Sequence, residues 1–140
     1  MQSRVAEADA RHRRGYNCAQ AVACTYADLV GVDEPTMFKA CEGLGLGMGG
    51  MEGTCGAASG ACVLAGFANS TGDLERPNSK GSTYKISREL VAAFGQRVGA
   101  TRCCQIKGRD TGVVLMPCND CVKTGAHVVE ETLFHGRFED

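Results

Sequence analysis

The segment from Cys55 to Ala68 constrains the fold more than any other part of the chain. It has no charged residue, its only polar side chain is Ser59, and alanines recur at every fourth position, at Ala57, Ala61 and Ala65. This composition predicts a helix that is buried on all sides rather than along one stripe. Because its side chains are small, we expect neighbouring helices to approach closely and the rest of the chain to pack around it.

The start of this helix bears on the chemistry of Cys55. Thr54 is a favourable N-cap residue, which puts Cys55 at the first helical position. Unpaired backbone N–H groups and the positive end of the helix dipole stabilise a thiolate at that position. Cys55 is therefore a candidate for redox or metal chemistry, and the alternative is a small buried cysteine that only fills space.

Helical patterns account for most of the remaining chain, and we find little β-sheet signal. Asn17 reads as the N-cap of a helix over 18–30 that Gly31 closes, so Cys18 also takes a first helical position. Pro117 precedes a final helix in which Cys118 faces inward at the first turn. The sequence predicts an all-α fold, a compact single-domain helical bundle over 1–140 around the Ala/Gly-rich helix. Further helices are expected over 3–14, from Asp33, and from Ser82 or Thr83 to Val98.

The glycine-rich segment 43–53 suits neither a regular helix nor a strand. Gly45, Gly47 and Gly50 match the G-x-G-x-x-G spacing of a dinucleotide-binding fingerprint, which requires a preceding strand in a βαβ unit. The preceding residues read as helix here. We favour a flexible loop whose bare backbone approaches a cofactor or a partner just before Cys55.

Charge and cysteine content limit the classes of function. The formal net charge is -1, with 15 basic and 16 acidic residues, so we expect binding to neither nucleic acid nor a membrane. The first residues alternate in charge where an export signal would be apolar, which indicates a cytoplasmic protein. In a reducing compartment, nine cysteines are expected to bind metal, to change redox state or to be buried, not to form a disulfide scaffold.

Four cysteines stand out by their place at helix starts. Cys18, Cys55 and Cys118 each begin a predicted helix, and Cys103 lies near such a start. If these ends converge, the four thiolates could hold an iron–sulfur cluster or zinc, or two of them could form a reversible disulfide. Cys121 adds a C-x-x-C spacing with Cys118, typical of thioredoxin-like motifs and metal knuckles. We interpret Cys24 as a packing cysteine. The three histidines are interpreted as ordinary surface residues: His12, His127 and His135.

The order of these motifs resembles a known family. The sequence 16–22 reads Tyr-Asn-Cys-Ala-Gln-Ala-Val, and it is followed by the glycine loop, Cys55-Gly56-Ala57-x-x-Gly60, Cys103-x-x-Ile106-x-Gly108 and Cys118. From about Gly15 to beyond Ala126 this pattern resembles the C_GCAxxG_C_C family of redox-active proteins. The resemblance implies that the functional cysteines are Cys18, Cys55, Cys103 and Cys118, with Cys104 and Cys121 as alternatives to the last two.

The resemblance also suggests a chemistry. A similar module accompanies haem in split-Soret cytochromes and binds an iron–sulfur centre there, which favours electron transfer with a protein partner that the sequence does not name. Covalent haem is not expected in this chain, since Val122 follows Cys121 where a haem attachment motif has histidine. A thiol/disulfide oxidoreductase or redox sensor is the second hypothesis, and a structural zinc domain or partner-binding helical module is the third. The Ala- and Gly-rich helices favour a homodimer.

Overall fold

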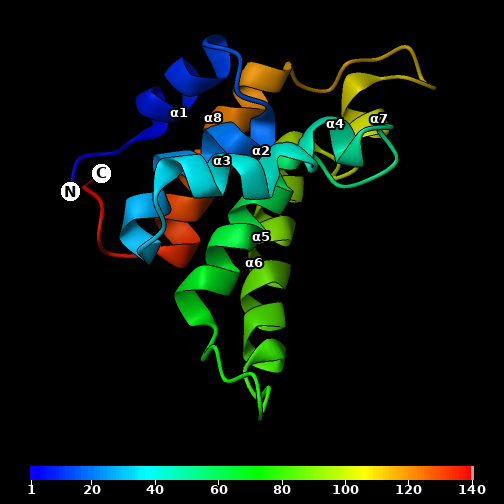
Figure 1. The fold of residues 1–140 in the computed structure, drawn as a ribbon. Helices are drawn as coiled ribbons and strands as arrows, with labels where there is room; N and C mark the ends of the chain where they lie inside the picture. The colour runs from blue at the N-terminus through cyan, green and yellow to red at the C-terminus, as the bar shows by residue number, and fades with distance from the viewer. Residues whose placement is uncertain (140) are drawn as a thin grey trace.

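Helix α5 (Gly56–Asn69) runs through the middle of the protein, as the sequence predicts (Figure 1). The computed structural model describes residues 1–139, and within that range the regular elements are all helical, with one isolated bridge between Thr54 and Arg102. The all-α prediction is therefore confirmed. The other elements are α1 (Val5–Arg13), α2 (Cys18–Thr25), the 3₁₀ turn η1 (Ala27–Val30), α3 (Glu34–Glu42), α4 (Gly45–Met48), α6 (Lys80–Val98), α7 (Cys103–Lys107), α8 (Cys118–Val128) and the π-helical turn η2 (Val129–Leu133).

Helices α5 and α2 pack closely, and their contact depends on two glycines of α5, which have no side chain. A Cβ atom placed on Gly60 would lie 2.6 Å from the carbonyl oxygen of Ala19, and one on Gly56 would lie 2.9 Å from the backbone nitrogen of Ala19. Neither distance leaves room for a methyl group. The two glycines therefore allow α5 to lie directly against the backbone of α2.

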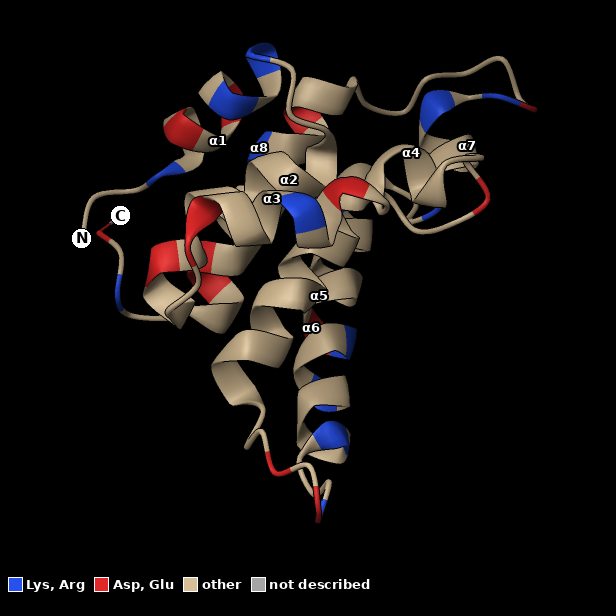
Figure 2. Cartoon of the chain, viewed as in Figure 1, with Lys and Arg blue, Asp and Glu red and all other residues tan. Residues whose placement is uncertain are grey.

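Helix α5 is more deeply buried over its first turns than over its last turns. Ala57, Ala61 and Leu64 are buried, whereas Val63 is half-buried and Phe67 is 48% exposed. The prediction of a helix buried on all sides is thus wrong for the last turns, where α5 and α6 extend together beyond the other helices (Figure 1). There α6 lies along α5, and the charged residues of α6 lie along its outer side (Figure 2).

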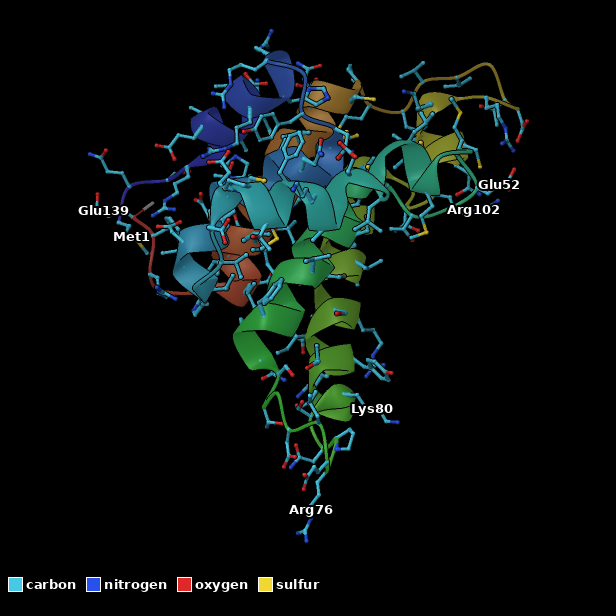
Figure 3. The ribbon with its side chains drawn as sticks, in the orientation of Figure 1. Met1, Glu52, Arg76, Lys80, Arg102 and Glu139 are labelled. Atoms are coloured by element: carbon cyan, nitrogen blue, oxygen red, sulfur yellow. The ribbon has the colours of Figure 1, made fainter. Side chains whose placement is uncertain are left out.

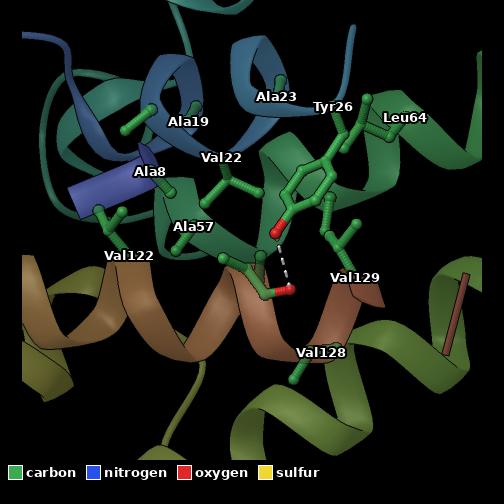
Figure 4. Packing of buried hydrophobic residues seen from close by; sticks show 14 of the residues in the cluster. Ala8, Ala19, Val22, Ala23, Tyr26, Ala57, Leu64, Val122, Val128 and Val129 are labelled. Carbon is green, nitrogen blue, oxygen red and sulfur yellow. Dashed lines mark hydrogen bonds between the residues drawn. The ribbon is translucent and has the colours of Figure 1, made fainter. Parts of the chain in front are cut away.

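The hydrophobic core lies where α2, α5 and α8 meet. Val22, Leu64 and Val122 are fully buried there, and Val22, Leu64 and Val129 lie around the ring of Tyr26 (Figure 4). The Tyr26 hydroxyl donates a hydrogen bond to the carboxylate of Glu130 at 2.5 Å. The same carboxylate accepts a hydrogen bond from the backbone N–H of Arg4 at 2.7 Å. These bonds satisfy the polar groups that enter the core.

Most of the predicted helix starts are confirmed. The Asn17 side chain accepts the N–H of Gln20, whose own side chain accepts the N–H of Asn17, and the pair forms a capping box. Asp33 caps α3, as predicted. The helix expected over 18–30 instead breaks at Tyr26, and a 3₁₀ turn follows before Gly31 closes it. Helix α6 begins at Lys80 rather than after a Ser82 or Thr83 cap.

Two features of the α5 region differ from the expectation. The residue in the N-cap position of α5 is Cys55 itself rather than Thr54, whose backbone instead pairs with Arg102 in the isolated bridge. The glycine-rich segment contains the short turn α4, in which Leu46, Gly47 and Met48 have left-handed backbone angles. The segment is neither a regular helix nor a strand, as composition indicates, but it contains this turn where a loop was expected.

No helix within residues 1–139 is both long enough and apolar enough to cross a membrane.

Replacing Gly60 by alanine tests the α2–α5 contact. We expect Gly60→Ala to lower the free energy of unfolding by about 1–3 kcal/mol, because the added methyl group overlaps the Ala19 backbone. Gly66→Ala on the same helix is the matched control, since nothing lies within 4 Å of its Cβ position. It is expected to stabilise the helix by about 0.5–1 kcal/mol. Urea unfolding measures both, and equal effects of the two substitutions would contradict the close contact.

Candidate functional site

Five cysteines from four helices line one cavity of about 200 Å³. They include all four that the sequence singled out, and the fifth is Cys121. The predicted convergence of distant sulfur atoms is therefore present in the structure. The cavity is lined by Cys18, Cys55, Cys103, Cys118 and Cys121, together with His12, Asn17, Leu46, Gly47, Gly56, Ile106 and Lys107.

Four of these cysteines lie at helix starts. Cys18, Cys103 and Cys118 are the first residues of α2, α7 and α8, and Cys55 is the N-cap of α5. The close contact of α5 with α2 brings Cys18 and Cys55 together, because a Cβ atom on Gly56 would lie 3.3 Å from that of Cys18. The first turns of four helices, where backbone N–H groups have no helical partners, therefore begin at the cavity.

Helix α7 is held against the start of α5 by backbone hydrogen bonds. The N–H of Cys55 donates to the carbonyl of Thr101 at 2.7 Å, and the N–H of Cys103 donates to Gly53 at 2.9 Å. Arg102 and Glu52 add an exposed ion pair at 2.9 Å on the outer side of this junction (Figure 3). The junction fixes Cys103 beside Cys55 although the two residues are far apart in the chain.

The glycine-rich segment lies against the cavity. A Cβ atom on Gly47 would lie 2.5 Å from that of Cys103, so the bare backbone of α4 covers this cysteine. Leu46 lines the cavity beside it and is 46% exposed, which places it at the mouth. The segment therefore shields the sulfur atoms from one side.

Four of the cavity cysteines shift one another's pKa values, namely Cys118, Cys18, Cys55 and Cys121. Hydrogen bonds with Cys118 and Cys55 raise the pKa of Cys18, since Cys18 keeps its proton as a donor. Hydrogen bonds from Cys121 and Cys18 lower the pKa of Cys55, and the N–H groups of Ala57 and Ala58 lower it further. These hydrogen bonds therefore favour the thiol form of Cys18 and the thiolate form of Cys55.

Cys118 has a second source of stabilisation. Its pKa is lowered by the hydrogen bond from Cys18 and by Lys107, whose Nζ lies 3.3 Å from the Cys118 Sγ. Cys121, by contrast, is 1% exposed, and its hydrogen bond to Cys55 raises its pKa. Burial raises the pKa of Cys103. The pKa values of the cavity cysteines are thus shifted in both directions.

Three lining residues were missed or misjudged from the sequence. His12 was interpreted as an ordinary surface residue, which is wrong: it is half-buried, and its Nε2 lies 3.9 Å from the Cys18 Sγ. Lys107 lies four residues after Cys103 on α7, a spacing that places both on one face. Cys121 lies three residues after Cys118, and the same rule could have placed it in the cavity.

The other cysteines lie elsewhere. Cys24 is buried away from the cavity, which confirms its interpretation as a packing residue, and burial raises its pKa to about 12. Burial likewise raises the pKa of Cys41 to about 11. Cys104 is buried but does not line the cavity, so the neighbours Cys103 and Cys104 face different surroundings, as expected.

The five cysteines line the wall of a cavity, and their arrangement differs from that of ligands around a single metal ion. Within residues 1–139, no group of three or more His, Cys, Asp or Glu side chains is placed to hold one metal ion. The cysteine side chains instead line the wall of the cavity of about 200 Å³.

Comparison with known proteins agrees with the pattern of cysteines. A family model described as “putative redox-active protein (C_GCAxxG_C_C)” matches residues 16–132, which include every cysteine of the cavity. The chain belongs to this family. The resemblance noted from the sequence is confirmed, and the C_GCAxxG_C_C pattern corresponds to cysteines that share one cavity. Comparison with curated proteins and with solved structures finds no significant match.

Alkylation tests the electrostatics of this family member's site. In metal-free reduced protein, we expect the rate at which iodoacetamide modifies Cys118 to rise with pH. The midpoint of this rise should lie well below the ordinary thiol pKa of about 8.5, so that the rate is already level at neutral pH. Cys24 and Cys41 should stay unmodified there, because burial raises their pKa values. Peptide mass spectrometry measures the rates, and urea-unfolded protein is the control. Equal rates for the three cysteines in the folded protein would contradict the assignment.

Proposed function

We propose that this protein transfers electrons through an iron–sulfur cluster held by Cys18, Cys55, Cys103 and Cys118. The observation that carries the proposal is the meeting of these four cysteines, from four separate helices, around one cavity of about 200 Å³. Cysteine thiolates are the usual ligands of such clusters. Membership of a redox-active family supports the same class of function.

The donor set fits a cluster better than zinc. Structural zinc takes four ligands tetrahedrally about one point, with Zn–S distances of about 2.3 Å. The cavity cysteines line a space instead, and no group of them within 1–139 is placed for one ion. A cluster contains several iron and sulfide atoms and needs such a space. When bound, it would accept and release single electrons.

The surrounding residues suit a redox centre whose charge changes. Helix starts direct N–H groups toward the cavity, and Lys107 adds a positive charge beside Cys118. Cys55 and Cys103 are 6% and 7% exposed, and the α4 backbone covers Cys103. The chain therefore stabilises negative charge on the sulfur atoms and limits contact with water, two properties that set the potential of such centres.

The shared cavity also favours a second candidate function, a thiol/disulfide oxidoreductase or redox sensor. Cys18, Cys55, Cys118 and Cys121 all line it, and hydrogen bonds among them shift their pKa values. Two of these sulfur atoms have lowered pKa values, as an attacking thiolate requires. Oxidation of one such pair forms one S–S bond and releases two electrons and the protons of the pair to an acceptor.

Anaerobic purification and serine substitution separate the two functions. We expect the protein to contain iron and acid-labile sulfide and to absorb visible light. Cys18→Ser, Cys55→Ser, Cys103→Ser and Cys118→Ser should each lose most of the iron. Cys24→Ser and Cys41→Ser are controls that should retain it, since both lie outside the cavity. Iron-free protein that instead forms a reversible disulfide within the cavity would contradict the cluster and support the second function.

A further inference from the structure

Lys107 is the single lysine or arginine that lines the cavity in the described part of the chain. Its Nζ donates a hydrogen bond to the Cys118 Sγ at 3.3 Å, and among residues 1–139 no carboxylate forms a salt bridge with it. Nearby arginines are paired differently: Arg102 with Glu52, and Arg109 with Glu52 and Asp110. The ammonium group of Lys107 is therefore directed to sulfur rather than to an acid.

The fold fixes this contact through the chain between α7 and α8. Lys107 ends α7, and Gly108 follows in a left-handed conformation, where a Cβ atom would lie 2.4 Å from the carbonyl oxygen of Val113. The N–H of Leu115 then donates to the carbonyl of Ile106 at 2.9 Å. The chain thus turns back over α7 and begins α8 at Cys118, next to the Lys107 side chain.

We propose that Lys107 is a positioning residue that raises the reduction potential of the cavity's redox centre by stabilising negative charge on the Cys118 sulfur. This inference rests on the proposed redox function, but it holds for both forms of that function. One-electron reduction of a cluster adds one negative charge to the centre and its thiolates. Reduction of a disulfide that includes Cys118 takes up two electrons and one proton, breaks the S–S bond and leaves one thiol and the Cys118 thiolate.

In both cases the reduced state carries more negative charge near Lys107 than the oxidised state. A fixed positive charge at hydrogen-bond distance favours the more negative state, and partial burial limits screening by water and salt. Hydrogen bonds to the sulfur atoms and nearby charge are established determinants of the potential of cysteine-bound centres. Removing the charge is therefore expected to make reduction harder.

Potentiometric titration of the reconstituted protein tests this role. Lys107→Gln is expected to reduce the equilibrium constant for reduction at least tenfold, which lowers the midpoint potential by about 59 mV for one electron or about 30 mV for two. Lys107→Arg keeps the charge and should stay close to the wild-type potential. Lys80→Gln is the matched control, because Lys80 starts α6 far from the cavity (Figure 3). An unchanged potential in Lys107→Gln, or an equal fall in Lys107→Arg, would overturn the proposal.

A second readout needs no redox centre. In metal-free reduced protein at the pH of the wild-type alkylation midpoint, Lys107→Gln should slow alkylation of Cys118 at least threefold, while Lys107→Arg and Lys80→Gln should not. If the wild-type protein shows no reversible redox transition, the proposed function is contradicted. Lys107 then has no redox centre to act on, even where alkylation verifies that it stabilises the Cys118 thiolate. A redox transition together with unchanged Cys118 alkylation in Lys107→Gln would overturn the role of Lys107 alone.

Discussion

The contact between the starts of α2 and α5 determines where the sulfur atoms lie. Gly56 and Gly60 let α5 rest on the backbone of Ala19, and the same contact places Cys18 beside Cys55. Gly125 repeats the arrangement for α8, because a Cβ atom there would lie 2.9 Å from the carbonyl oxygen of Ala57. Close packing of the core and assembly of the cavity are therefore consequences of the same small residues.

Burial and local charge act against each other on the cysteines of this protein. Where burial acts with little compensation, as at Cys24 and Cys41, the thiol is favoured and the pKa rises. At Cys55 and Cys118, hydrogen-bond donors outweigh burial and lower the pKa. The chemistry of each sulfur atom thus follows from what faces it, not from cysteine content alone.

Local sequence signals predicted the helices but not all of their ends. Asn17, Asp33 and Gly31 act as predicted because caps depend on neighbouring residues. Thr54 was misassigned because its backbone pairs with Arg102, a long-range contact that no local pattern reveals.

The site was predictable to a similar extent. The four cysteines at or near helix starts could be named from the sequence, and the family pattern reinforced them. The approach of His12 to Cys18 and of Lys107 to Cys118 could not, since each depends on how separate helices pack. The spacing of Lys107 from Cys103 indicates only that these two residues share a face of α7. Cys121 is intermediate: its spacing from Cys118 allowed a place in the cavity, but only the packing of α8 shows that it lines the same cavity as Cys55.

Cross-linking of two distant cysteines tests the convergence most directly. A variant that keeps only Cys18 and Cys118 should react with dibromobimane to form a fluorescent intramolecular bridge, because the Cys18 Sγ lies 4.0 Å from the backbone carbonyl oxygen of Cys118. A variant that keeps only Cys24 and Cys118 should not be bridged while folded. Separate modification of Cys18 and Cys118 without a bridge, in protein whose helical circular dichroism is intact, would contradict the shared cavity.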